Sequence, residues 1–470
     1  MEWNHLLDIN NKGGIKINIK IDPVTRISGF LDISTEVENN IVTNAKTSGL
    51  LFRGFEKMLK GRSPLDAIYF TERICGICST SHGIASSLAL ENALKITIDI
   101  NDQYIRDLIH GFEIMQNHLR QFYFLTLPDY VKLPDINPVS PQQYTDYRLP
   151  EELNKRLSDH YIKSIQYSRL AHEGLAVLGG KAPHNHGIFL GGITVNIDAY
   201  KLEKVKSIIT QIKDFIEMYM LEDMNIISKY YQDYFEKGES YSNYMSYGLF
   251  NNYKEPEISY VKPGVMINGK RQLLDINNIN ENIRYSWYLS DETIEKPGIE
   301  EIEEVDLKKT DAYSFVKAAR YKGLPMEGGP LARMMITGEY TKGSSCMDRN
   351  TARVLETQKI IKIMDNIVNR IEIKNNNQRI YEMPNSAFGV GLTDTIRGTL
   401  GHWVQIENKV IKYYDIITPS GWNLSPIDEK GIHGPAEKAL IGTKLGNSEG
   451  NPELGRIIRS FDPCISCATH

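Results

Sequence analysis

The chain has few cysteines, no long apolar run and no strong excess of one charge. Five cysteines in 470 residues are too few for a disulfide framework. No apolar stretch approaches the roughly 18 residues of a membrane helix, and the first residues lack the basic and apolar segments of a secretory signal. We therefore expect any export or membrane attachment to come from a partner. The 54 basic and 59 acidic residues are interspersed, which argues against nucleic-acid binding.

The composition is that of an ordinary globular protein. Hydrophobic residues make up 41% and charged residues 24%, enough apolar content to exclude general disorder. The predicted fold class is mainly α with small β layers (α+β), a central helical bundle with N-terminal and C-terminal β-hairpins. We expect one domain over 1–470, divided into a β region (1–60), a helical core (61–235), an irregular insertion (238–310) and a C-terminal part (311–470).

Local patterns support this fold class at both ends of the chain. Isoleucines at every second position from Ile15 to Ile21 are typical of a half-buried strand. A hairpin is expected to follow, turning at 38–40, and a second hairpin is predicted near 402–417 with its turn at 407–409.

Between these hairpins, apolar residues three and four positions apart predict helices. They are expected near 80–95, 101–127, 151–178, 199–235, 349–374, 434–440 and 452–460. Ser79, Asn101 and Asp198 are the predicted N-terminal caps of three of them.

Four of the five cysteines form two C-x-x-C pairs at opposite ends of the chain. Cys75 and Cys78 are predicted to open a helix, whereas Cys464 and Cys467 lie just before the last residue, His470. Thiolates are soft ligands for zinc, nickel, copper or iron, and two pairs supply a four-sulfur site. One pair alone could be a redox dithiol or buried packing, and zinc is the default metal for two.

The residues around both pairs closely resemble the large, catalytic subunit of nickel–iron hydrogenases, in a mature form that ends at the C-terminal histidine. The matching blocks occur in order along nearly the whole chain, with the weakest match over 238–310. They are Asp22–Ile27, Arg53–Glu56, Arg73–His82, Gly179–Lys181, Gly328–Arg333, Arg397–Trp403, Pro419–Asn423 and Asp462–His470.

The resemblance implies a nickel–iron centre held by the four cysteines. All four would bind nickel, and Cys78 and Cys467 would also bridge to an iron that carries carbon monoxide and cyanide. The resemblance further implies a magnesium or similar divalent ion near the C-terminus, held by Glu56, the carbonyl of Ile416 and His470. Retained water in the shell suits magnesium.

Further residues are assigned to the surroundings of the centre by the same resemblance. His82 would donate a hydrogen bond to a bridging sulfur, and the Arg397 guanidinium would lie over the open metal position. Asp129 and Asp462 would hold Arg397, while Ser420 and the backbone of Pro419 would line the pocket for the diatomic ligands. Cys464 and Arg397 are the candidate proton acceptors, although the high pKa of arginine makes its deprotonation costly.

Two positions depart from the family pattern. Ser28 stands where the family has a glutamate that carries protons, so its hydroxyl is a candidate relay through water. Ile396 replaces a proline before Arg397, which affects the pocket for the diatomic ligands. Cys346 matches no ligand position and is predicted to be a free core cysteine.

The function that the resemblance implies is reversible heterolytic cleavage of H2 to two protons and two electrons. No cysteines remain for an iron–sulfur cluster, so the electrons must pass to an iron–sulfur small subunit in a heterodimer or a dimer of heterodimers. A membrane electron-acceptor subunit is a further candidate partner, and the small subunit's signal would decide export and location.

Two other functions remain as alternatives to the hydrogenase. One is a relative of the quinone-reactive subunit of complex I, which shares the fold but lacks the four cysteines that are present here. The other is a zinc-stabilised structural protein, which metal analysis would distinguish. The direction of the reaction, the electron acceptor and the oxygen tolerance stay open.

Overall fold

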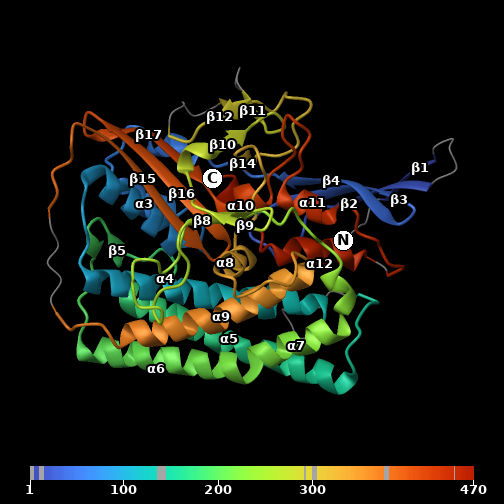
Figure 1. Ribbon diagram of the computed structural model, residues 1–470, viewed down its shortest axis with the longest axis horizontal. Helices are drawn as coiled ribbons and strands as arrows, with labels where there is room; N and C mark the ends of the chain where they lie inside the picture. The colour runs from blue at the N-terminus through green and yellow to red at the C-terminus, as the bar shows by residue number, and fades with distance from the viewer. Residues whose placement is uncertain are drawn as a thin grey trace.

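Long helices form one layer of the molecule, and small sheets with short helices lie above them (Figure 1). The computed structural model describes residues 5–9, 15–134, 144–289, 293–298, 304–374, 380–448 and 450–470. The helices of the bundle are α4 (Ile100–Arg120), α5 (Glu151–Gly179), α6 (Ala199–Phe215), α7 (Leu221–Tyr230) and α9 (Cys346–Val368). Helix α4 packs between α5 and α9, and α6 packs on the same two helices. This arrangement confirms the predicted α+β class with a helical bundle.

The predicted helices exist, but several of their ends differ from the predicted positions. Asp198 caps α6 as predicted, because its side chain accepts from the N–H of Lys201. The cap of α4 is Asp99 instead of Asn101, which lies inside the helix. Helix α3 (Ser79–Leu94) begins after Cys78, so Ser79 is its first residue and not its cap. Helix α9 ends at Val368, short of the predicted 374.

The N-terminal sheet is antiparallel in the order β1 (His5–Ile9), β2 (Ile15–Ile21), β3 (Leu31–Glu38) and β4 (Ile41–Gly49). Its predicted turn is present, since Asn39 and Asn40 both have positive φ angles of 51° and 62°, as two-residue hairpins require. The last residue of β4, Gly49, faces the C-terminal segment. A Cβ there would lie 3.2 Å from the Thr469 side chain.

The C-terminal sheet supports α3. Strands β15 (Ser386–Thr395), β16 (Gly398–Glu407) and β17 (Val410–Ile417) are antiparallel, so the predicted hairpin is confirmed and β15 adds a strand. Gly389 and Gly391 lie directly under α3, where a Cβ would be 2.1 Å and 2.0 Å from its backbone oxygens. The two glycines therefore allow the helix that follows Cys78 to lie on the sheet.

Short elements make up most of the remaining described chain. The short strands are β5 (Ile188–Phe189), β6 (Gly192–Ile193), β7 (Tyr244–Ser246), β8 (Gly264–Ile267), β9 (Lys270–Gln272), β10 (Ile279–Asn282), β11 (Tyr288–Leu289), β12 (Ile294–Glu295), β13 (Glu304–Val305) and β14 (Ala318–Tyr321). The stretch predicted to be irregular thus contains several of them, and parts of it (290–292 and 299–303) lie outside the described residues.

Short helices occur along the whole described chain. They are α1 (Phe55–Leu59), α2 (Asp66–Glu72), η1 (Gln121–Thr126), η2 (Leu127–Asp129), η3 (Ile216–Met220), η4 (Gln232–Phe235), η5 (Ile276–Asn278), α8 (Pro330–Thr337), α10 (Pro419–Asn423), α11 (Pro435–Leu440), α12 (Pro452–Ser460) and α13 (Ile465–Ala468). Helices α11 and α12 match the two short helices predicted before the last cysteines.

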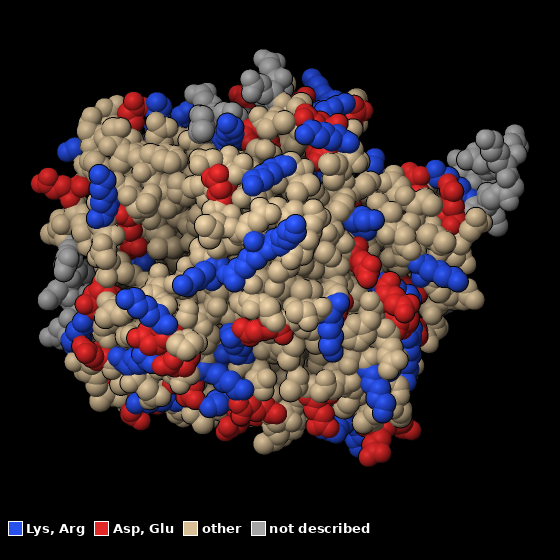
Figure 2. All heavy atoms as spheres, in the orientation of Figure 1, with Lys and Arg blue, Asp and Glu red and all other residues tan. Residues whose placement is uncertain are grey.

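The surface carries charges of both signs. On the face in Figure 2, basic and acidic side chains alternate over the helical layer, and tan uncharged surface separates them elsewhere. In the described parts of the chain, no helix combines the length and the apolar character that crossing a membrane requires.

Candidate metal centre

Four buried cysteine sulfurs meet in the interior, although their two pairs lie far apart in the sequence. The Sγ atoms of Cys75 and Cys464 are 3.5 Å apart, and those of Cys78 and Cys467 are 3.2 Å apart. All four sulfurs lie within 4.8 Å of one another, and none forms a disulfide. Four soft donors in a dry pocket fit a thiophilic transition metal.

Backbone contacts bring the last residues to the first cysteine pair. Ser28 donates its N–H to the carbonyl of Pro463 at 3.2 Å and accepts from the N–H of Ile465 at 2.8 Å. The Arg53 guanidinium also donates to the carbonyls of Ile74 and Ser466, which directly precede Cys75 and Cys467. The chain end is therefore held inside the fold, where a free terminus would fray.

Gly29 permits this close approach. A Cβ at this position would lie 2.8 Å from the backbone nitrogen of Ser466, and the φ angle of Gly29 is +86°. The Ser28 hydroxyl, the predicted relay, lies 3.4 Å from that of Ser466.

Arg397 is buried beside the second cysteine pair. Its Nε donates to the carbonyl of Asp462 at 2.8 Å, and its Nη2 lies 3.1 Å from the Asp462 carboxylate. Burial disfavours the charged form, but Asp462 and the cysteine thiolates outweigh it and hold the pKa of Arg397 above its usual value. Arg397 is therefore a fixed positive charge and a poor proton acceptor.

Two neighbours of Arg397 were not predicted from the sequence. Asn117 accepts from Arg397 at 3.4 Å and donates to Asp462 at 2.9 Å, and Arg353 lies 3.4 Å from the same carboxylate. Arg397 Nη1 has no hydrogen-bond partner among the described residues. A small cavity of about 10 Å³ adjoins Arg397, Arg353 and Gly328. No motif in the sequence pointed to Asn117, in the last turn of α4, or to Arg353, in the interior of α9.

Asp129 does not share the position of Asp462. Its carboxylate accepts from Arg459 twice at 2.7 Å and pairs with Arg26. Burial alone would raise the pKa of Asp129, but Arg26 and Arg459 lower it to about 2. Asp129 thus holds Arg459, three residues before Asp462, while Asp462 itself holds Arg397.

Ser420 and Pro419 lie at the start of α10, beside Cys464. The Ser420 hydroxyl accepts from the N–H of Cys464 at 3.0 Å, so the predicted pocket residue also positions the backbone of Cys464. Ile396 is fully buried before Arg397. Cys346 is a free, buried cysteine 3.3 Å from the carbonyl of Arg456, which confirms its prediction as a core residue.

His82 belongs to a buried chain of polar side chains. Its Nδ1 lies 3.1 Å from His402 Nε2, and the other ring nitrogen of His402 lies 2.9 Å from the Tyr414 hydroxyl. Burial, with a contribution from His470, lowers the pKa of His82 to about 3, so the ring is neutral. The His82–His402 pairing was not expected from the sequence, because 320 residues separate the two rings.

Glu56 and His470 meet at the C-terminus. His470 Nε2 lies 3.2 Å from Glu56 Oε1, and the N–H of Ile416 donates to the same oxygen at 2.9 Å. Burial opposes ionisation of Glu56, but His470 lowers its pKa to about 2. Asp415, which the sequence analysis missed, is a second acid here; burial and Glu56 raise its pKa to about 8. Its position directly before Ile416 was the only available signal.

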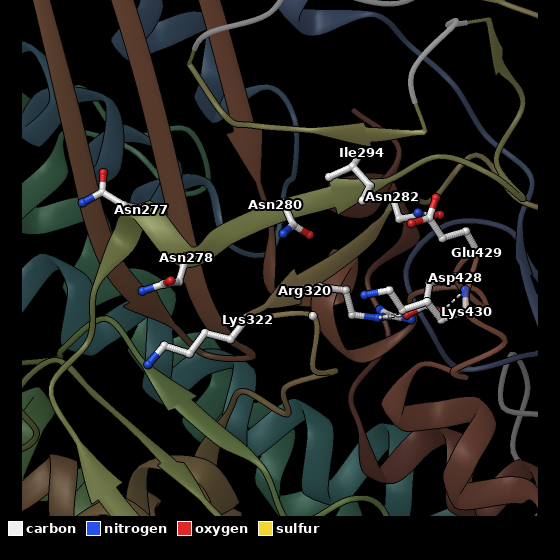
Figure 3. Close-up of a pocket in the computed structure, with 11 residues that line it drawn as sticks. Asn277, Asn278, Asn280, Asn282, Ile294, Arg320, Lys322, Asp428, Glu429 and Lys430 are labelled. Atoms are coloured by element: carbon white, nitrogen blue, oxygen red, sulfur yellow. Dashed lines mark hydrogen bonds and ion pairs between the residues drawn. The ribbon is translucent and has the colours of Figure 1, made fainter.

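A separate pocket of about 270 Å³ lies between strand β10 and residues 428–430 (Figure 3). Asparagines of β10 line it together with Arg320 and Asp428, whose side chains meet at 2.8 Å. Arg320 also donates to the carbonyls of Pro426 and Ile432. The pocket contains none of the predicted site residues, and its arginine already has its partners.

Comparison with known proteins gives the family. The profile of the nickel-dependent hydrogenases matches residues 53–145, 140–344 and 337–470. The chain belongs to the nickel-dependent hydrogenase family. It is similar to the periplasmic [NiFeSe] hydrogenase large subunit of Desulfomicrobium baculatum (32% identity over 97% of this chain and 95% of that protein). It is also similar to the hydrogenase-2 large chain of Escherichia coli K12 (29%, covering 96% and 97%).

Solved structures agree over the same length. The Ni-Fe-Se hydrogenase of D. vulgaris Hildenborough superposes with a TM-score of 0.92 at 35% identity, covering 97% of this chain and 100% of that one. The chain is thus a hydrogenase large subunit, the catalytic subunit, and the name implies a small-subunit partner. The comparisons support neither the complex I-like alternative nor the zinc-stabilised structural protein.

Proposed function

We propose that this hydrogenase cleaves H2 heterolytically and reversibly at a nickel–iron centre bound by Cys75, Cys78, Cys464 and Cys467. The meeting of four buried sulfurs beside a buried arginine carries the proposal. When bound, such a centre supplies a Lewis-acidic site that polarises H2 and takes up its electron pair. Cys78 and Cys467, 3.2 Å apart, are the sulfurs proposed to bridge to an iron with carbon monoxide and cyanide ligands.

The protein's own groups have distinct roles in this proposal. Arg397 holds a fixed positive charge beside the sulfurs, where it stabilises negative charge that develops during cleavage. Asp462 and Asn117 orient its guanidinium. Asp129 acts indirectly, because it holds Arg459, which lies three residues before Asp462. Cys464 is the proposed first proton acceptor, and Ser420 fixes the backbone of that residue through its N–H. Pro419 and Ile396 line the pocket around the proposed diatomic ligands.

A divalent ion, magnesium by preference, is proposed near the C-terminus. Glu56 and His470 already face each other, and a carboxylate oxygen is the type of ligand that magnesium selects. The carbonyl of Ile416 is the third proposed ligand, and Asp415 adds a second carboxyl close to the ion. His82, four residues after Cys78, is proposed to act on the bridging sulfur from its neutral ring.

The electron path is proposed to continue in an iron–sulfur small subunit. Four of the five cysteines meet at the centre and Cys346 is buried in the core, so this chain offers no cluster ligands of its own. A membrane electron-acceptor subunit would be a further partner beyond the small subunit.

Infrared spectroscopy of the purified complex, combined with metal analysis, tests the proposed function. We expect one carbonyl band and two cyanide bands, with nickel and iron present. Zinc alone, with those bands absent, would overturn it. For Ser28, the test is Ser28→Ala: a loss of H/D exchange supports a relay through its hydroxyl, and unchanged exchange rejects it.

A further inference from the structure

Two buried carboxyls lie beside the first turn of α3 and have no part in the site described so far. Glu113 comes from α4 and Glu72 from α2, and each side chain is about 1% exposed. Carboxylates are almost never fully buried without a cation. Among the described residues, however, the groups that hydrogen-bond to these two are hydroxyls, an amide and backbone N–H groups.

Glu113 accepts from the helix that follows Cys78. Its Oε1 accepts from the N–H of Thr80 at 2.6 Å, and its Oε2 accepts from the N–H and the hydroxyl of Ser81 at 2.9 Å and 2.6 Å. The first N–H groups of a helix lack partners within the helix and carry partial positive charge. Glu113 therefore binds the positively polarised start of α3, which directly follows Cys78.

A short chain of hydrogen bonds links Glu113 to Glu72. Asn185 Nδ2 donates both to the Thr80 hydroxyl at 3.1 Å and to Glu72 Oε1 at 3.3 Å, and the Thr80 side chain also hydrogen-bonds to Glu113. Gly83 makes room for the second carboxyl, since a Cβ there would lie 2.7 Å from Glu72 Oε1. The two carboxyls thus belong to one connected group.

Glu72 lies under a loop that reaches solvent. Asn185 is buried, but it belongs to residues 180–186, whose ends Gly180 and His186 are exposed. The partly exposed ring of His184 in the same loop lies 2.9 Å from the Glu72 carbonyl. The pair therefore runs from the helix after Cys78 towards the surface.

Burial, opposed by the hydrogen bonds from Ser81 and Thr80, raises the pKa of Glu113 to about 7. Burial and then Glu113 raise the pKa of Glu72 to about 9, although Arg73 and Lys181 oppose the shift. His110 faces the Ser81 hydroxyl at 3.2 Å, and burial and Arg333 lower its pKa to about 3, so its ring stays neutral. Near neutral pH, the pair can both accept and release a proton.

We propose that Glu113 and Glu72 carry protons between the cysteine centre and solvent on the side of the 180–186 loop. This inference rests on the proposed function. Each H2 yields two electrons, which leave to the small subunit, and two protons. Each proton in turn binds an ionised Glu113 oxygen and leaves it through water to Glu72 and solvent, which restores the carboxylate for the next one. The Asn185 amide donates to both sides, so it holds the two carboxyls in place and does not itself carry the proton. Glu113 is a relay, because it contacts none of the four sulfurs directly.

Glu113→Gln in the metal-loaded complex tests the relay, because glutamine keeps the shape of the side chain and one of its two acceptor oxygens but has no carboxylic acid proton to pass on. Two rates separate the steps. Conversion of para-H2 to ortho-H2 needs cleavage and recombination alone, whereas exchange of D2 with H2O also needs protons to reach solvent. We expect exchange to fall about 100-fold and para-H2 conversion to stay near the wild-type rate.

Asp107→Asn is the matched control. Asp107 is a buried carboxyl on the same helix, hydrogen-bonded to Gln103 and Tyr253, and its variant should keep both rates. Glu72→Gln should lower exchange by a smaller factor. Infrared difference spectra add a measurement that is independent of turnover: a carboxylic acid band that titrates near pH 7 should vanish in Glu113→Gln.

Unchanged D2–H2O exchange in both variants would overturn the relay. Equal losses of both rates in Glu113→Gln, with loss of nickel, would also overturn it and make Glu113 a structural cap of α3. Failure of the proposed function looks different, since the wild-type complex would then lack para-H2 conversion and the carbonyl and cyanide bands.

Discussion

Two buried clusters of ionisable side chains adjoin the cysteine pairs, and they differ in how the charges of their members are balanced. The arginine cluster (Arg353, Arg397 and Asp462) lies beside the second cysteine pair. In it, two guanidinium groups form ion pairs with one carboxylate. The carboxyl pair (Glu72 and Glu113) lies beside the first cysteine pair, and within the described part of the chain its side chains accept hydrogen bonds from neutral donors and a helix end only.

This difference decides what each group can do. Opposite charges at short range favour the ionised forms, so the pKa of Arg397 is raised and its charge is permanent. Burial without a paired cation favours the neutral carboxyl, so the pKa of Glu113 rises to about 7. One side of the centre therefore supplies a constant electrostatic field, and the other supplies groups that titrate.

The largest expected effect comes from Arg397→Lys. An ammonium cannot reproduce the two contacts that the guanidinium makes with Asp462. We expect H2 oxidation to fall about 100- to 1000-fold while nickel and iron stay bound, measured by turnover and metal analysis. Arg106→Lys breaks a buried arginine pair with Glu91 elsewhere and should lower stability but not turnover per folded molecule. Equal losses in the two variants would show that the position of Arg397 is irrelevant.

The next effect is on stability. Asp462→Asn leaves two buried guanidiniums facing a neutral amide, which we expect to lower the free energy of unfolding by about 3–5 kcal/mol. Denaturant titration measures this loss. The double variant Asp462→Asn with Arg397→Met removes one of those uncompensated charges and should recover part of it. No recovery would mean that the pairing of Arg397 and Asp462 does not determine the loss.

The carboxyl pair predicts that the stability of the protein depends on pH with a definite sign. The pKa of Glu72 is raised from 4.5 to about 9, so the folded protein holds a proton that the unfolded chain releases above pH 4.5. Stability should therefore fall as pH rises from about 4.5 to about 9. Glu72→Gln should remove up to about 1.4 kcal/mol per pH unit of this slope.

Melting temperatures of wild type and Glu72→Gln across this pH range test the prediction. Glu151→Gln, at an exposed position in the first turn of α5, serves as the control and should keep the wild-type slope. A wild-type slope in Glu72→Gln would contradict the expected proton uptake.

The smallest expected effect concerns Asn117, which supports the arginine cluster. Asn117→Ala removes one hydrogen bond to Asp462 and a longer one to Arg397. A hydrogen bond to a charged group is worth about 1.5–3 kcal/mol, so we expect the free energy of unfolding to fall by an amount in that range. A loss as large as that in Asp462→Asn would mean that Asn117, and not the charge of Asp462, is the main support of Arg397.

Local sequence patterns predicted the elements better than their ends. Alternating isoleucines and the Asn39–Asn40 turn identified β2, β3 and β4, since strand period and turn chemistry are encoded by neighbouring residues. The start of α3 was missed by one residue because Cys78, held by distant contacts, occupies the cap position. Strand β15 was missed because its inward glycines serve α3 and give no alternating pattern.

The sequence by itself predicted a thiolate metal site. Two C-x-x-C pairs in ordered motifs point to the proposed ligands, because a thiolate's affinity for soft metals is a property of the residue. Tertiary structure alone decided the charges around them. Whether a carboxyl is ionised depends on burial and on which distant side chain faces it. Asp129 therefore pairs with Arg26 and Arg459, Asp462 holds Arg397, and Glu113 accepts hydrogen bonds from neutral donors at the start of α3.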